Sequence, residues 1–443
     1  MASDQHIVQL VRRAGFGANA AEVSIATGDG YGATVDRLIA GLAAPDTGAD
    51  RVPEPRLGSA VDFELRLRGA RSAGDTATAR SIEQQMTSDA HALITWWLAR
   101  MVATTQPLRE KLTFLLHGHF ATAISKVRFA DLMLRQNQLL RNQGAGSFAD
   151  LTQAVAVDPA MLLWLDAASD VAADPNENFA RELMERFTMG IGNYREADVR
   201  SAAYCFTGWR IDLRRGGFLF DPALHSDVVQ QVLGAPVTSG QQVIALVTRS
   251  APGTRFVPAS LWSRLAHPVS PDDPVVTDLA KAYAPELSIA GLLRAIFEHP
   301  AFLAGSSATG LVKQPVEWLV GSLRAFGVTT AQVFSHQGLL LETLSQMGQI
   351  PFNPPNVGGW GQNDYWLSTS AALARWRFAH DLAGAVDLSA VADARPASRA
   401  EAIRVVLGVP SWTPGTSAAL ARAAGDPVLT TTLALMSPEY VTN

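Results

Sequence analysis

Apolar residues recur every three or four positions along most of the chain, which is the spacing of one face of an α-helix. The clearest examples are residues 57–103 and the strongly apolar stretch 108–120. Residues 209–220 differ, because apolar and polar positions alternate there around Gly216 and Gly217, a pattern typical of a β-hairpin. We therefore predict a mainly α-helical fold: a large multi-helix domain with one short β-hairpin near residues 209–220.

The distribution of loop-forming residues predicts how the helices are grouped. Residues 43–55 are dominated by Ala, Pro, Asp and Gly, which indicates a linker after a first set of helices. A smaller Ala-rich helical region begins after position 388. We expect N-terminal helices in residues 1–42, a main helical domain in 43–388, and a small C-terminal helical region in 389–443 that packs on the main domain.

Residues 348–366 are unlike the rest of the chain. They contain three prolines, four glycines, three asparagines and two tryptophans. This composition is too rigid and too aromatic for a flexible linker, so we expect an ordered loop. It has two interpretations, a structural clasp on the helical core or a wall of a pocket. In the second, Asn356 and Trp360 line the pocket together with Arg181.

Residues 174–190 carry the clearest helix signals. Asp174 suits the N-cap, Pro175 suits the first helical position, and Gly190 suits the left-handed position after the last turn. At about 100° per residue, apolar side chains form one stripe. The opposite face carries Asn178, Glu182 and Glu185.

This polar face has two interpretations. It is either solvated, with the i,i+4 pairs Arg181–Glu185 and Glu182–Arg186, or it faces inward. Burial of the two glutamates is costly unless they pair with arginine or bind a cation. The second interpretation makes the face a candidate site.

Two short histidine clusters are further candidates. Side chains two positions apart in a regular helix point about 200° apart, so His117 and His119 reach one ion only at a broken helix end, which Gly118 permits. The alternative is a pair of ordinary buried or capping histidines. His225 and Asp227 follow the predicted hairpin and form either a ligand cluster or a simple turn.

Composition narrows the class of protein. The 443 residues are 48% hydrophobic and carry a net charge of −5, so no basic surface indicates a nucleic-acid partner. Cys205 is the single cysteine, which excludes an intramolecular disulfide and a cysteine zinc site. No run approaches the roughly 18 apolar residues that span a membrane, and the first ten residues lack a signal-peptide pattern. We expect a cytoplasmic protein from the sequence as given.

Several segments resemble one bacterial family, domain of unknown function 1800 (DUF1800). The most specific are the run from Pro175 to Glu185 and the Pro-Pro-Asn-Val-x-Gly-Trp run in residues 348–366. The matching segments keep the family order over nearly the whole chain: residues 6–17, 109–122, 175–194, 196–209, 312–327 and 348–366.

The resemblance implies a mainly helical fold and no settled activity. Many members are exported, and their genes commonly neighbour a second family, domain of unknown function 1501, which resembles the sulfatase and alkaline-phosphatase superfamily. The family pattern has Asn where this chain has Gly118, and Lys where it has Gln230. A family histidine is replaced by Ser250, so the chain resembles a divergent member.

The sequence leaves three hypotheses for function. The first is a metal-dependent enzyme, hydrolytic rather than oxidative, that holds zinc, manganese or iron in a His and carboxylate site. Asn178 and Asp227 are further catalytic candidates in it. Its expected metal ligands are His117, His119, Glu182, Glu185 and His225.

The second hypothesis is a non-catalytic helical scaffold for a phosphatase-like or sulfatase-like partner of the domain of unknown function 1501 type, with the polar face and the Trp360 loop as its interface. The third is a metal-free enzyme in which Glu182 and Glu185 act as general acid and base. The sequence has no Gly-x-Ser-x-Gly nucleophile elbow, no Gly-x-Gly-x-x-Gly dinucleotide turn and no Gly-Lys-Ser/Thr phosphate loop. Ser-His-Asp catalysis therefore has no support in the sequence. The small-molecule substrate is not identified by the sequence.

Overall fold

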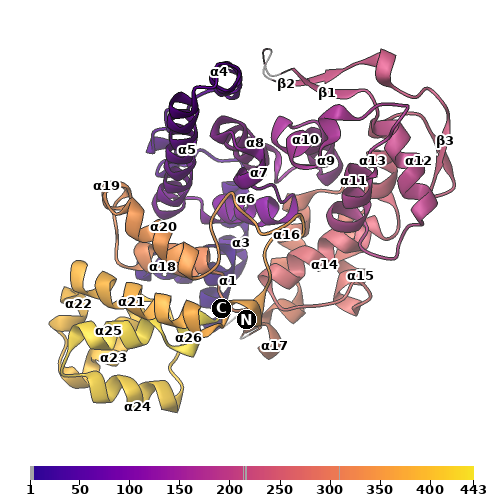
Figure 1. Ribbon diagram of the computed structural model, residues 1–443. Helices are drawn as coiled ribbons and strands as arrows, with labels where there is room; N and C mark the ends of the chain where they lie inside the picture. The colour runs from indigo at the N-terminus through magenta and orange to yellow at the C-terminus, as the bar shows by residue number, and fades with distance from the viewer. Residues whose placement is uncertain (1–3, 213, 215–216, 309) are drawn as a thin grey trace.

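A computed structural model describes residues 4–212, 214, 217–308 and 310–443. The described chain is mainly helical, as predicted, with two small antiparallel ribbons (Figure 1). Helix α6 (Pro107–His119) lies in the middle, between two hydrophobic cores. Leu112 and Leu116 face the first core and Phe114 faces the second. The end of α6 is therefore surrounded by both halves of the molecule.

The first core joins the N-terminal helices to the middle of the chain. Leu10, Val35 and Leu38 pack in it with residues from positions 140–302, so the N-terminal helices share a core with the helices expected in the main domain. Its elements are α1 (Asp4–Ala14), α3 (Tyr31–Gly41), α8 (Ala130–Gln143), α9 (Phe148–Ala156), α10 (Pro159–Trp164), α11 (Glu177–Glu182), α12 (Glu196–Phe206), α13 (Gly240–Arg249), α14 (Gly253–Leu265), α15 (Pro274–Tyr283) and α16 (Ile289–Glu298).

The second core joins the C-terminal helices to the long helix α5 (Thr76–Ala103). Trp97, Trp318 and Phe378 are buried in it with Ile403 and Leu435. The other helices around it are α4 (Ala60–Ser72), α7 (Ile124–Val127), α18 (Pro315–Ala325), α19 (Thr330–Ser335), α20 (Gln337–Gln346), α21 (Thr369–Ala385), α22 (Ser389–Ala392), α23 (Arg399–Val406), α24 (Pro414–Ala423), α25 (Pro427–Leu435) and α26 (Pro438–Val441).

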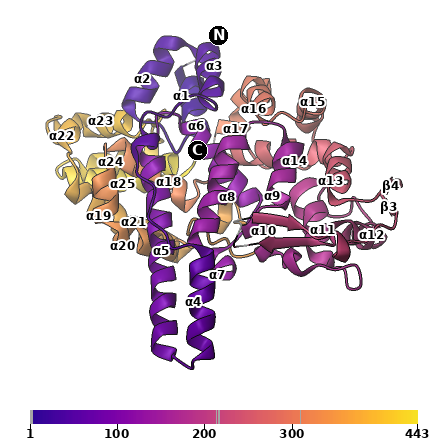
Figure 2. The same cartoon turned by 90° about the horizontal axis from the view of Figure 1, so that it is seen from above.

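Two short helices lie outside these groups. Helix α2 (Ala20–Asp29) begins with a capping box between Asn19 and Glu22 and packs on α1 through a small cluster of its own. Helix α17 (Gly305–Ala308) lies in the chain between α16 and α18. Helices α4 and α5 pair as an antiparallel hairpin whose far end projects from the body of the protein (Figure 2).

The predicted hairpin is present, with strands β1 (Trp209–Asp212) and β2 (Gly217–Phe220). Gly216, one of the two glycines expected in its turn, lies outside the described residues. A second ribbon was not predicted: β3 (Gln230–Val232) pairs with β4 (Ala235–Val237) through a turn in which both central residues have positive φ. Its strands are only three residues long, so they carry too little alternation to be recognised in the sequence.

Candidate functional site

The segments with the most specific sequence features meet at the end of α6. Helix α6 runs through His119, so its two histidines point to different neighbours. Nε2 of His117 accepts a hydrogen bond from the Phe352 N–H at 3.0 Å, and Nε2 of His119 donates one to the Phe187 carbonyl at 2.8 Å. The two ring nitrogens therefore connect α6 to two separate parts of the chain.

His117 lies in an aromatic environment. Its ring centroid is 5.3–5.4 Å from the ring centroids of Trp97, Phe352 and Trp360, and the side chain is buried. Burial lowers its pKa to about 3, so the imidazole is neutral. Burial also lowers the pKa of His119 to about 4. Both histidines act as neutral hydrogen-bonding groups near pH 7.

The loop of residues 348–366 packs on this helix end, as the orange segment that crosses beside α6 (Figure 1). Gly359 has φ +75°, and a Cβ atom there would lie 2.2 Å from the Gly118 carbonyl oxygen. Trp360 is buried, whereas Asn356 is exposed and accepts the Gly358 N–H at 2.8 Å. Gly359 and Trp360 thus hold this part of the loop closely against α6, and Trp360 itself is buried.

The helix expected at residues 174–190 begins later than predicted. Asn176, not Asp174, is the N-cap, and its side chain accepts the Asn178 N–H. Pro175 precedes the helix. Asp174 instead donates its N–H to Val171 in a tight turn, which is why it does not cap. The helix ends as predicted, with Gly190 at φ +82°.

The same helix changes its winding after Glu182. Residues Leu183–Thr188 form a π-helix, in which the Thr188 hydroxyl donates to the Leu183 carbonyl at 2.6 Å. The Gly190 N–H donates to Met184, six residues back. A π-turn widens the helix and leaves carbonyl groups without their usual partners, and such turns are frequent at functional sites. The hydrogen bond from His119 satisfies the Phe187 carbonyl.

Glu182 and Glu185 lie on either side of this change in winding and have different partners. The Glu185 carboxylate accepts the Tyr194 hydroxyl at 2.7 Å and pairs with Arg186 at 2.9 Å. The Glu182 Oε2 is buried without a hydrogen-bond partner among the described residues, and Arg186 Nε lies 3.9 Å away. Burial, and then the charge of Glu185, raise the pKa of Glu182.

The other members of the predicted polar face have structural contacts. Arg181 does not pair with Glu185 as expected; it pairs with Glu177 and binds Glu196 through two hydrogen bonds of 2.8 and 2.9 Å. The wider π-turn turns Glu185 away from the regular i,i+4 position. Asn178 donates its amide to the Leu165 carbonyl at 3.3 Å, at the end of α10.

His225, which follows the hairpin together with Asp227, contacts other parts of the chain than the end of α6. His225 has Nδ1 2.8 Å from the Thr207 carbonyl oxygen and Nε2 3.1 Å from that of Thr238. Both ring nitrogens therefore face backbone atoms that follow α12 and β4. Asp227 is exposed. The contacts assign His225 to holding this loop in place.

The predicted metal ligands are thus dispersed among three groups. Within the described residues, no three His, Cys, Asp or Glu side chains gather as a group able to hold a metal ion. For His117 and His119 to bind through Nε2, they would have to release the Phe352 N–H and the Phe187 carbonyl. Metal binding by these residues stays a prediction.

Two features of the site were not anticipated from the sequence. Tyr194 reaches Glu185 only because the chain reverses at Gly190 and Gly192, both at positive φ. A set of buried basic residues on α1, α6 and α14 lines a separate cavity. The available signal was the presence of Arg13 and Lys111 next to apolar residues of their helices, Val11 and Leu112 among them.

The fold is that of a large helical protein with polar groups gathered at the end of a central helix. A protein-family model described as a protein of unknown function (DUF1800) matches residues 9–442, so the chain belongs to the DUF1800 family. Searches of curated proteins and of solved structures each returned no significant match. In the described part of the chain, no helix has the length and apolar character needed to cross a membrane.

Proposed function

We propose that this protein is a metal-independent acid–base enzyme in which Glu182 donates a proton and Glu185 accepts one. The observation that supports it is the buried Oε2 of Glu182, which has no hydrogen-bond partner among the described residues. Burial of a carboxylate oxygen that accepts no hydrogen bond is costly, with Arg186 Nε 3.9 Å away, and a protonated carboxyl group reduces that cost. Burial and the nearby charge of Glu185 raise the pKa of Glu182, which favours it over Glu185 as the proton donor.

Glu185 has a different set of partners. Arg186 and the Tyr194 hydroxyl both stabilise a carboxylate at this position. Burial and hydrogen bonding to Glu185 raise the pKa of Tyr194 to about 12, so the tyrosine keeps its proton and donates the hydrogen bond. Two carboxyl groups with different environments are the usual arrangement for acid–base catalysis.

Hydrolysis is the reaction class that this pair would serve. Glu185 takes a proton from water as the water oxygen bonds to the electrophilic carbon of the substrate. The bond between that carbon and the leaving oxygen breaks, and Glu182 transfers its proton to that oxygen. The pair then returns to its starting state when solvent carries one proton from Glu185 to Glu182.

An activity screen tests this proposal. The protein is assayed with chromogenic esters and glycosides, with and without chelator, beside Glu182→Gln and Glu185→Gln. We expect each variant to lose about 10²-fold or more of any activity found. The exposed Glu342→Gln serves as the matched control and keeps full activity. Activity that survives in Glu182→Gln contradicts the proposal, and activity lost to chelator and restored by added metal supports the metal-dependent hypothesis instead.

A further inference from the structure

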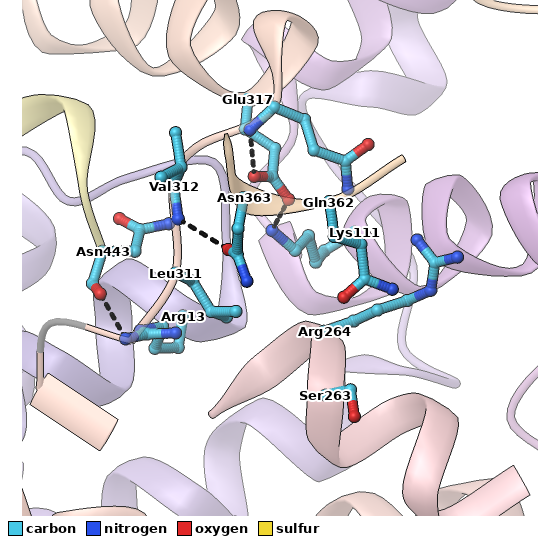
Figure 3. Close-up of a pocket in the computed structure, with 11 residues that line it drawn as sticks. Arg13, Lys111, Ser263, Arg264, Leu311, Val312, Glu317, Gln362, Asn363 and Asn443 are labelled. Carbon is cyan, nitrogen blue, oxygen red and sulfur yellow. Dashed lines mark hydrogen bonds and ion pairs between the residues drawn. The ribbon is translucent and has the colours of Figure 1, made fainter. Parts of the chain in front are cut away.

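A cavity lined by polar side chains lies where several separate segments meet. Its residues, which we call the cation pocket, are Arg13 of α1, Lys111 of α6, Arg264 of α14, Glu317 of α18, and Gln362 with Asn363 of the 348–366 loop (Figure 3). Three of these six side chains are cationic and one is acidic. The pocket therefore brings together more positive than negative charge.

The first two cations have partners. Lys111 Nζ pairs with Glu317, whose other oxygen accepts the Gln314 N–H at 2.9 Å. Arg13 donates to main-chain oxygens, including that of Ala266 at 3.0 Å and that of Asn443. Glu317, the acidic side chain among these six, is thus already engaged by Lys111.

Arg264 is different. Its guanidinium makes no hydrogen bond or ion pair in the described part of the chain, and its Nε is buried without a partner. Burial lowers its pKa, and the charge of Glu317 offsets part of that shift without forming an ion pair with Arg264. Lys313 is a second basic residue whose side-chain nitrogen is buried without a hydrogen-bond partner among the described residues. Its Nζ lies 3.6 Å from the ring centroid of Tyr440.

Neutral donors lie beside this charge. In Figure 3 the Gln362 amide lies between Lys111 and Arg264. Asn363 accepts the Val312 N–H through Oδ1 at 3.1 Å, which leaves its amide N–H groups for another partner. The cavity has a volume of about 20 Å³, enough for one water-sized group. A cationic fork beside amide donors suits an anionic group, of which a cavity of this size admits one oxygen atom.

We propose that the cation pocket binds the carboxylate group of a small molecule, with Arg264 as its charge partner and Gln362 as a second donor. The planar guanidinium matches the two oxygens of a carboxylate. This inference rests on which pocket residues have hydrogen-bond and ion-pair partners, and it does not depend on the role of Glu182.

Acetate is the probe that tests the proposal. Thermal unfolding and calorimetric titration are measured with sodium acetate against sodium fluoride at equal ionic strength. We expect saturable stabilisation of the wild-type protein by acetate and at least a tenfold weaker affinity in Arg264→Gln. In Arg255→Gln, the matched control on the same helix, the response stays that of the wild type, because Arg255 contacts Pro271 outside the pocket.

Other outcomes of these titrations would overturn the proposal. A wild-type protein with no saturable response to acetate, or an Arg264→Gln variant that binds acetate as tightly as the wild type, overturns the proposal. Inorganic phosphate that binds tenfold more tightly than acetate also overturns it, because the pocket then selects a larger oxyanion. Gln362→Met, which removes only the amide, must weaken acetate several-fold, and it decides the matter if Arg264→Gln does not fold.

Discussion

The Nε2 atom of His119 lies 2.8 Å from the carbonyl oxygen of Phe187, so the last residue of α6 donates a hydrogen bond to the π-helix. This contact joins the centre of the fold to the segment that carries Glu182 and Glu185. Without the donor, a carbonyl of the π-helix loses its partner. The position of the paired glutamates therefore depends on a histidine more than 60 residues earlier in the chain.

Replacement of His119 tests this dependence. His119→Phe removes the donor and keeps an aromatic ring, and we expect the free energy of unfolding to fall by about 1–3 kcal/mol because a buried carbonyl is left unpaired. His119→Gln retains a donor and should recover part of the loss. Urea unfolding measures both variants. Equal stability of His119→Phe and the wild type would show that the hydrogen bond is dispensable.

Because His117 is buried and neutral, we expect the free energy of unfolding to fall in acid. The native state keeps this imidazole neutral, with a pKa of about 3, whereas the unfolded chain binds a proton near pH 6.5. Stability from this group is complete above pH 6.5 and falls as the pH is lowered toward the native pKa. At pH 5 the loss is about 2 kcal/mol. His117→Gln should show that much less change between pH 7.5 and 5 in urea unfolding, and an identical pH dependence contradicts the assignment.

Two glycine substitutions test the contact of the 348–366 loop with α6. Gly359→Ala places a Cβ atom against the Gly118 carbonyl at a positive φ, and we expect destabilisation of about 2–5 kcal/mol. Gly338→Ala is the control, because that glycine lies in α20 with open space around it. It should stabilise the protein by about 0.5–1 kcal/mol. A neutral Gly359→Ala in thermal unfolding would mean that the loop is not closely packed.

Metal content separates the two enzymatic hypotheses. Because both histidines of α6 already bind backbone groups, we expect chelator to leave the melting temperature unchanged. Elemental analysis of protein purified without affinity nickel should find no stoichiometric metal. One or two equivalents that disappear in a His117→Ala/Glu182→Ala double variant would instead establish the metal site that the sequence first indicated.

Much of the fold follows from local pattern. The apolar spacing predicts the helices, and the alternation around residues 209–220 predicts the first ribbon. The caps are less secure, because Asp174 and Asn176 are both good capping residues and only tertiary contacts choose between them. The second ribbon is too short to leave a pattern.

The site was less accessible to prediction. The sequence places Glu182 and Glu185 on one predicted helix face, but it does not reveal that the helix becomes a π-helix between them. The partner of His117 is the N–H of Phe352, 235 residues away. The spacing of apolar residues along the chain does not predict such a long-range contact. The absence of a hydrogen-bond partner for Arg264 Nε among the described residues is visible only in the folded structure.

The most direct test of the acid–base pair is a titration of the Glu182 carboxyl group by ¹³C NMR in protein labelled at glutamate, with Glu182→Gln used for assignment. The account predicts a pKa above the ordinary 4.5 of glutamate in the wild type. It also predicts a lower pKa in Glu185→Gln, where the neighbouring negative charge is gone. An ordinary pKa that does not change in Glu185→Gln would contradict the proposed pair.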